Sequence, residues 1–237
     1  MNFTDQGIII SKKPLQERSY ILSVFTKSHG IYSGVLTQYT KKMGDNLVSS
    51  NLVDFHWNAR LHEHLGYAKA DLIKSYNSHL MINKTKLYAF NSITSLLQLA
   101  FCEREPHNNL FPILLDFLDS MKHEFSFEKY FKLELAILAE SGYSLQLDSC
   151  AVTGACDNLH YISPKSGRAV SKSVGAPYAD KLLLLPKFVE SNINQDPQTI
   201  QSALKLTTYF FNRYILLDKP LPLTRQYFFE HMFKISQ

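Results

Sequence analysis

The first 76 residues alternate between apolar runs and turn residues, a pattern that predicts short β-strands. Val53, Phe55 and Trp57 recur at every second position, which is the period of a strand with one buried face. Turns are expected at 13–14 and 43–46, and strands over 7–10, 20–25, 30–39, 47–57 and 66–73. Five short strands in so short a segment predict a small barrel, an OB-fold first and an SH3-like barrel as the alternative.

From residue 79 onward, apolar residues recur at three- and four-residue spacing, which predicts amphipathic helices. The first helix carries this spacing in Leu87, Phe90, Ile93, Leu96, Leu97 and Ala100. Further helices are expected over 110–122, 127–141, 196–210 and 225–233. We expect Asn109 to cap the second helix, Gly142 to end the third, and Asp196-Pro197 to open the fourth.

Residues 148–187 break the helical pattern with glycine and proline, which predicts turns and short extended pieces. The residues responsible are Gly154, Gly167, Gly175, Pro164, Pro177 and Pro186. The predicted fold is therefore α+β, with a five-stranded OB-fold barrel over 1–77 and an all-helical domain over 78–237. A loop-rich insert is expected within the helical domain, at about 148–187.

Composition is that of a soluble globular protein, with 45% hydrophobic and 19% charged residues. The net charge of +4 is the sum of +3 for residues 1–77, −2 for 78–147 and +3 for 148–237. We expect no membrane helix and no secretory signal, since neither a long apolar run nor a basic leader is present. Three cysteines, an odd number, favour a reducing compartment, so the expected location is the cytoplasm.

Residues 158–179 contain Lys165, Arg168 and Lys172 and no acidic residue. Such a basic, glycine- and serine-containing loop can contact phosphate oxygens through both side chains and backbone N–H groups. This makes the three cations predicted DNA-binding residues. The alternative is a solvated basic loop with no ligand.

A second acid-free stretch, 18–44, contains Arg18, Lys27, Lys41 and Lys42. In an OB-fold, Lys41 and Lys42 would follow the third strand, beside the face that commonly binds single strands. These four cations are also predicted DNA-binding residues. Three tyrosines could stack on bases, although core positions are favoured for them: Tyr20, Tyr32 and Tyr39.

Metal sites are not predicted. Cys150 and Cys156, with His160 nearby, lack the second pair of ligands that a closed zinc site needs. Cys102 is interpreted as a small core residue on a helical face. The run 62–64 (His-Glu-His), near His56, could bind a transition metal if it formed a strand, because its two histidines would lie on the same side. A solvated loop is favoured.

Catalytic residues are not predicted either. The sequence contains no phosphate-binding Gly-x4-Gly-Lys-Ser/Thr loop, no Gly-x-Ser-x-Gly elbow and no His-Glu-x-x-His helix. Glu103 and Glu105 flank Arg104, a poor setting for the carboxylate cluster of a metal nuclease. A binding function is favoured, and a divergent nuclease is the remaining enzymatic alternative.

Several long stretches resemble the RecO family of bacterial recombination mediators, and the resemblance covers most of the chain. They are GIIISKKP at 7–14, ILSVFT at 21–26, VDFHWNARL at 53–61, CAVTG at 150–154, YISPKSGRAVS at 161–171 and GAPYAD at 175–180. The resemblance implies an OB-fold, a helical domain and a zinc-finger-like insert. It further implies a protein without catalytic activity or cofactor that binds single- and double-stranded DNA and anneals complementary strands. The implied partners are RecR, with which it helps RecA load, and the C-terminal tail of single-strand-binding protein.

Two departures from the family pattern change these expectations. The four zinc-binding cysteines of relatives correspond to Cys150, Thr153, Ser171 and Val174, so the insert is expected to be metal-free. Residues 37–40 replace a stretch that is often rich in glycine and arginine, which shifts the expected DNA contact toward the insert. The remaining alternative function is a protein-docking adaptor with only incidental DNA contact.

Overall fold

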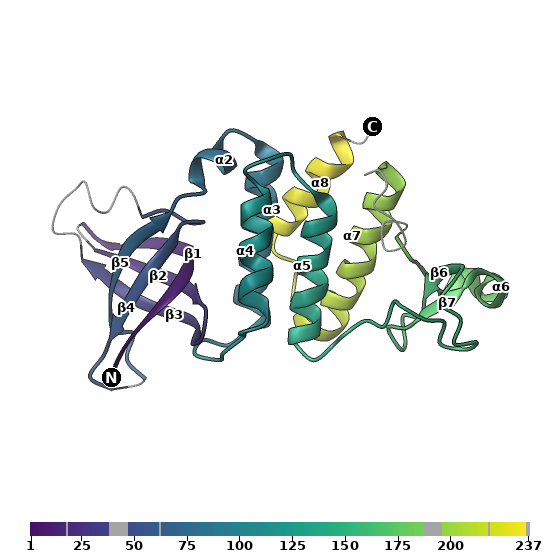
Figure 1. Cartoon of the computed structure of the whole chain (residues 1–237), viewed down its shortest axis with the longest axis horizontal. Helices are drawn as coiled ribbons and strands as arrows, with labels where there is room; N and C mark the ends of the chain where they lie inside the picture. Colours follow the sequence, from purple (N-terminus) through teal and green to yellow (C-terminus); the bar gives the residue numbers. More distant parts are fainter. Residues whose placement is uncertain (18, 38–46, 62, 187–195, 218, 236–237) are drawn as a thin grey trace. The chain divides into compact units, whose positions relative to one another are not determined.

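The computed structural model describes residues 1–237 except 18, 38–46, 62, 187–195, 218 and 236–237 (Figure 1). The chain divides into two compact units, Met1–Phe125 and Ser126–Gln237. The α+β class is confirmed, because a five-stranded barrel precedes a helical region. The predicted domain bounds, 1–77 and 78–237, stay a prediction.

The barrel closes in the strand order β1-β2-β3-β5-β4. Its strands are β1 (Asn2–Gln16), β2 (Ser19–Thr26), β3 (Gly30–Thr37), β4 (Leu52–Asn58) and β5 (Tyr67–Lys74). All pairs are antiparallel except β3 with β5, which is parallel at Val35–Tyr67 and Leu36–Ala68. This is the closure of the five-stranded OB-fold barrel, so the OB-fold prediction is confirmed.

Strand β1 is much longer than the expected 7–10, because its first half pairs with β4 and its second half with β2. The turn expected at 13–14 is wrong. Pro14 lies inside β1 opposite Tyr20, next to an irregularity in the pairing. Proline is tolerated at such a bulge because no regular ladder hydrogen bond is required of it there.

The barrel core follows the period-two pattern of the sequence. Val53, Phe55 and Trp57 are all buried, together with Val24 from β2 and Tyr32 from β3. The indole Nε1 of Trp57 donates to the carbonyl oxygens of Ser33 (3.1 Å) and Leu65 (3.0 Å). These bonds satisfy the one polar atom of the ring, so the tryptophan can be buried without an unpaired donor.

Helices α2 (Asn77–Met81), α3 (Lys84–Ala100) and α4 (Leu110–Ser120) complete the first unit. Two predictions about them are wrong. Asn109 makes no side-chain capping bond, because its own backbone is already helical (φ −74°, ψ −26°). Cys102 is exposed, because α3 ends two residues before it and the chain leaves the helical face.

The segment after α3 runs along β3. The backbone N–H of Arg104 donates to the carbonyl of Ile31 at 2.8 Å, and Glu103 pairs with the same strand residue. At Gly30 (φ +77°) an added Cβ would lie 1.9 Å from the carbonyl oxygen of Glu105. Glycine is therefore required there for both its positive φ and the close approach of this backbone.

The second unit contains three long helices and the insert (Figure 1). The helices are α5 (Phe127–Glu140), α7 (Pro197–Phe211), continued by the π-type turn η3 (Asn212–Leu216), and α8 (Leu223–Ile235). Asp196 caps α7 by accepting from the backbone of Gln198 and Thr199, and Gly142 (φ +90°) follows α5. Both of these helix-end predictions are confirmed.

The insert is more regular than the expected turns. It holds a small sheet of order β7-β6-β8 and two short helical segments. The elements are β6 (Leu159–Ile162), β7 (Ala169–Ser171), α6 (Lys172–Gly175), η1 (Ala176–Lys181) and β8 (Leu183–Leu184).

A buried ion pair joins the three long helices of the second unit. Nε of Arg225 on α8 donates to Oε1 of Glu134 on α5 at 2.6 Å, and both side chains are fully buried. The Thr207 hydroxyl on α7 donates to the other carboxylate oxygen at 2.6 Å, and the Tyr130 hydroxyl donates to Oε1. One carboxylate thus accepts from side chains on α5, α7 and α8. Glu134 and Arg225 are 91 positions apart, so no local sequence pattern signals the pair.

Replacing Glu134 by leucine is expected to lower the free energy of unfolding by about 3–5 kcal/mol, because Arg225 would remain as an uncompensated buried charge. Urea denaturation followed by circular dichroism measures this. Glu230→Leu, on the exposed side of α8, is the control and should cost less than about 1 kcal/mol. Adding Arg225→Met to Glu134→Leu should restore much of the loss. Equal losses for Glu134→Leu and Glu230→Leu would contradict the assigned role.

Candidate nucleic-acid interface

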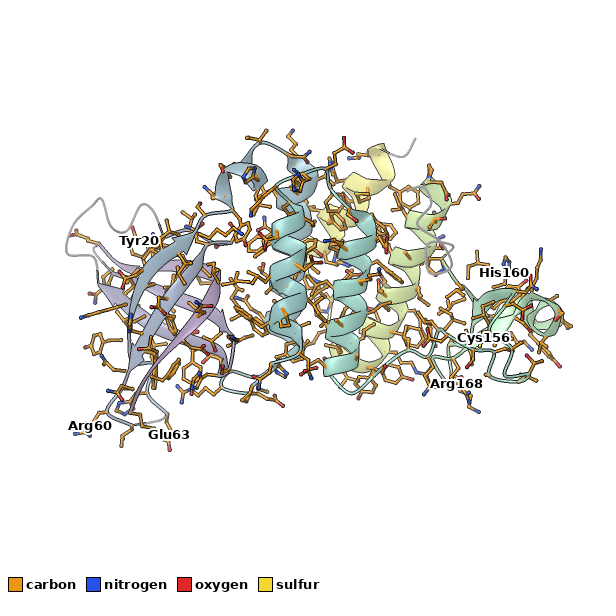
Figure 2. The ribbon with its side chains drawn as sticks, in the orientation of Figure 1. Tyr20, Arg60, Glu63, Cys156, His160 and Arg168 are labelled. Atoms are coloured by element: carbon orange, nitrogen blue, oxygen red, sulfur yellow. The ribbon has the colours of Figure 1, made fainter. Side chains whose placement is uncertain are left out.

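The three cations predicted in the insert are all exposed. Lys165 lies in the turn between β6 and β7, Arg168 directly precedes β7 and Lys172 begins α6 (Figure 2). Within the described part of the chain, no carboxylate forms an ion pair with any of them. Their charges are therefore available to a polyanion.

The β6–β7 turn, which holds Lys165 and Arg168, is closed by its own backbone. Gly167 N–H donates to the carbonyl of Ser163 at 2.8 Å, and Ser163 N–H donates to the carbonyl of Arg168 at 2.9 Å. Gln146 pairs with the next residues, donating to the Gly167 carbonyl (3.0 Å) and accepting from Ala169 N–H (2.8 Å). Arg168 is thus held at a fixed place although its side chain is exposed.

Gly167 has φ +67° and is buried. A Cβ there would lie 2.8 Å from Cδ2 of Leu145, so the turn packs closely on the segment that follows α5. A side chain at this position would strain the backbone and push the turn away from Leu145. The position of the basic turn therefore depends on this glycine.

Three of the four positions that correspond to zinc ligands lie together. The Cys150 thiol donates to the Ser171 hydroxyl (3.5 Å), and Ser171 N–H donates to the sulfur (3.3 Å). Burial by itself raises the pKa of the Cys150 thiol, but hydrogen bonds from Thr153 and Ser171 outweigh it and lower that pKa to about 6. Hydrogen bonds from these two residues favour the thiolate form of Cys150.

Among the described residues, no group of three His, Cys, Asp or Glu side chains is placed to hold a metal ion. Cys156 is exposed, with its sulfur 3.9 Å from the carbonyl of Gly154 (Figure 2). The absence of zinc from this protein stays a prediction.

Purified protein is expected to contain no stoichiometric zinc, because only one thiolate remains at the four corresponding positions. Elemental analysis by mass spectrometry measures this. The restoring variant Thr153→Cys/Ser171→Cys/Val174→Cys is the matched control, and it should bind about one zinc per chain through four thiolates. One zinc per parent chain that Cys150→Ser removes would contradict the prediction.

The predicted cations of the barrel are only partly described. Lys27 is exposed directly after β2, whereas Arg18, Lys41 and Lys42 lie outside the described residues, as does Tyr39. Their role in DNA binding stays a prediction.

Two predicted stacking tyrosines lie inside or against the barrel. Tyr32 is only 6% exposed and belongs to the core, as favoured. Tyr20 is half-buried, and Nζ of Lys12 lies 4.4 Å from its ring centroid (Figure 2). Neither ring is free to receive a base on both faces.

The histidines of the barrel do not form a metal clip within the described residues. Nδ1 of His56, on β4, lies 2.8 Å from the Thr4 hydroxyl, and its Nε2 lies 3.7 Å from Asp71. His64 is exposed in the β4–β5 loop, which also exposes Arg60 and Glu63 (Figure 2). His62 lies outside the described residues.

Two clusters were not found by sequence reasoning. Arg104 lies over the rings of Tyr32 (5.6 Å) and Trp57 (5.7 Å), and its guanidinium donates to the carbonyl of His64. In the second unit, Arg213 lies over the rings of Tyr209 and Tyr214, and Tyr214 stacks on Tyr143. Each cluster joins residues that are distant in sequence. The only local signal is the four-residue spacing of Tyr209 and Arg213 in the second cluster.

The strand order and the parallel pairing of β3 with β5 define an OB-fold protein, a class whose barrels bind oligonucleotides or oligosaccharides. Residues 1–76 match the family model of the recombination protein O N terminal, and residues 83–221 match that of its C terminal. The chain therefore belongs to the recombination protein O (RecO) family.

Its relatives named DNA repair protein RecO are similar over nearly their whole length. The chain is 52% identical to that of Rickettsia bellii (strain OSU 85-389) over 235 residues, which are 98% of this chain and 97% of the relative. It is 49% identical to that of Rickettsia felis over 237 residues, 100% of both chains.

Among the described helices, none combines the length and the hydropathy needed to cross a bilayer.

Proposed function

We propose that this protein acts in the cytoplasm as a DNA repair and recombination mediator that is not itself an enzyme. It binds single- and double-stranded DNA and anneals complementary strands. With RecR, it helps RecA load on DNA coated by single-strand-binding protein. Membership of the RecO family supports the repair role. The observation that carries DNA binding is the exposed set Lys165, Arg168 and Lys172, with no described carboxylate partner.

The insert suits phosphate contact without base reading. Its cations extend from a hairpin turn and from the start of a four-residue helix, and neither element is long enough to enter a major groove as a recognition helix. Cations on such elements contact phosphates of either strand form, so binding should depend on salt and little on sequence. Annealing of two strands needs this kind of contact and no nucleotide hydrolysis.

Reversing the three charges (Lys165→Glu, Arg168→Glu, Lys172→Glu) is expected to cripple DNA binding and annealing while the fold stays intact. Losing three phosphate contacts should lower the slope of log affinity against log salt by about 2–3, at roughly 0.7–0.9 for each contact. Fluorescence anisotropy over a salt series measures the slope, and the parent's affinity should fall sharply as salt rises.

The matched control reverses three exposed lysines of the same unit, Lys205, Lys219 and Lys234, which changes the net charge equally. It should retain most of the slope. Substituting Lys41 and Lys42 should have a smaller effect than the insert triple. A folded insert triple variant that binds DNA like the parent would leave the insert as a solvated basic loop.

A protein-docking role is proposed beside DNA binding, since the family resemblance implies both. Residues 78–237 should bind the acidic, apolar-ended tail of single-strand-binding protein, because this region is rich in aromatic residues with basic residues among them. Calorimetry with a tail peptide should show saturable binding, and a peptide of the same composition in scrambled order should bind more weakly. Heat indistinguishable from dilution at high micromolar peptide would argue against this partner.

A further inference from the structure

A stack of tyrosine rings and one guanidinium lies at the surface of the second unit. The rings of Tyr143 and Tyr214 are parallel within 11°, with centroids 4.3 Å apart. The guanidinium carbon of Arg213 lies 5.4 Å from the Tyr214 centroid and 6.0 Å from that of Tyr209, and Nη1 donates to the Tyr209 hydroxyl at 2.8 Å. We name these four residues the tyrosine–arginine ladder.

Backbone geometry at the ends of two helices builds the ladder. Gly142 (φ +90°) reverses the chain after α5, and Tyr143 N–H donates back to the carbonyl of Leu138 at 2.9 Å. At the end of α7, the π-type turn η3 carries Arg213 and Tyr214. Such turns are uncommon and are frequent at functional sites. The Tyr214 ring also stacks on the ring of buried Phe210, with centroids 6.1 Å apart and an interplanar angle of 13°.

The ladder is not part of the core. Tyr143 exposes 38% of its surface and Arg213 is exposed, while Tyr209 and Tyr214 are half-buried. Within the described residues, no carboxylate pairs with Arg213. Tyr143 is therefore partly open to solvent while its ring is stacked on Tyr214, and Arg213 is an exposed cation with no described carboxylate partner.

The ladder lies near the basic turn of the insert. Phe210, which supports Tyr214, lies 3.8 Å from where a Cβ on Gly167 would be. Gln146 pairs directly with Arg168, and Tyr143 precedes Gln146 by three residues, at most about 11 Å of extended chain. A strand held by the insert cations can therefore reach the ladder within a few nucleotides.

We propose that the ladder is a base-stacking site for single-stranded DNA, in which an unpaired base stacks on the exposed side of Tyr143. Arg213 contacts a neighbouring phosphate, and the insert cations hold the continuing backbone. Bases in a duplex have their faces covered by neighbouring pairs, so only an unpaired strand can use this site. This inference rests on the proposed function and adds a strand preference to it.

An acidic peptide is the other ligand that an exposed arginine beside aromatic rings could take. The parallel arrangement of Tyr143 and Tyr214 favours a nucleic-acid base, because a planar base extends such a stack by one more layer. The experiment therefore includes the acidic tail peptide as a competing outcome.

Tyr143→Leu removes the ring and keeps a shorter apolar side chain. Its affinity for a short oligothymidine should fall about 5- to 160-fold, the range for one lost base stack. Its affinity for an abasic strand of equal length should be unchanged, since that strand has the phosphates and no bases. Tyr143→Phe should bind both strands like the parent. Tyr227→Leu, which removes an exposed tyrosine of α8, is the matched control and should also leave both affinities unchanged.

The outcomes separate the two proposals. A parent that binds neither strand would overturn the proposed function and this inference together. A parent that binds both in a salt-dependent way, with Tyr143→Leu indistinguishable from it, would overturn the inference alone. Equal losses of Tyr143→Leu on both strands would exclude stacking. Loss of tail-peptide binding with DNA binding intact would make the ladder a protein-docking site.

A second readout needs no variant of the ladder. A strand with 2-aminopurine in place of one base should change its fluorescence when the parent binds, because stacking on a tyrosine ring alters that base directly. Sliding the fluorescent base along the strand should locate the stacked position. Binding seen by anisotropy with no fluorescence change at any position would also overturn the inference, even if Tyr143→Leu failed to fold.

Discussion

The carboxylate of Glu134 is the interaction on which the second unit depends. It is fully buried, and it accepts from Arg225, Thr207 and Tyr130 across three helices. Removing two charges from water is costly, and one guanidinium nitrogen of Arg225 has no partner among the described residues. Such a pair adds little net stability, but either charge left alone would be costly to bury, so α5, α7 and α8 have to keep both charges paired. The insert and the ladder extend from helices fixed in this way.

Local patterns of the sequence predicted most of the fold. The period-two run at Val53, Phe55 and Trp57 gave the barrel wall, and Asp196 and Gly142 marked helix ends, because each is decided by neighbours a few residues away. The predictions for Asn109 and Cys102 were wrong because local residue type does not decide capping or burial at those positions. Capping and burial there depend on backbone angles and on where a helix ends, which residue type alone does not specify.

The candidate site was less predictable, because its geometry is made by long-range contacts. Charge along the sequence identified Lys165, Arg168 and Lys172 as a group, but nothing in it placed Gln146 beside Arg168. Tyr143 follows α5 and Tyr214 follows α7, so their rings can stack only once these two helices have packed together. Pairs of this kind carry no local signal, so only the three-dimensional structure brings them together.

The turn at Cys150 is held by hydrogen bonds at positions where the family resemblance implies zinc ligands. Hydrogen bonds among a thiol, hydroxyls and backbone N–H groups close it, where thiolate–zinc bonds would otherwise do so. These hydrogen bonds form within the chain and need no metal ion. In the metal-free state that is expected here, chelators and zinc starvation have nothing to remove from the turn, so the position of the basic hairpin beside it does not depend on a supply of metal.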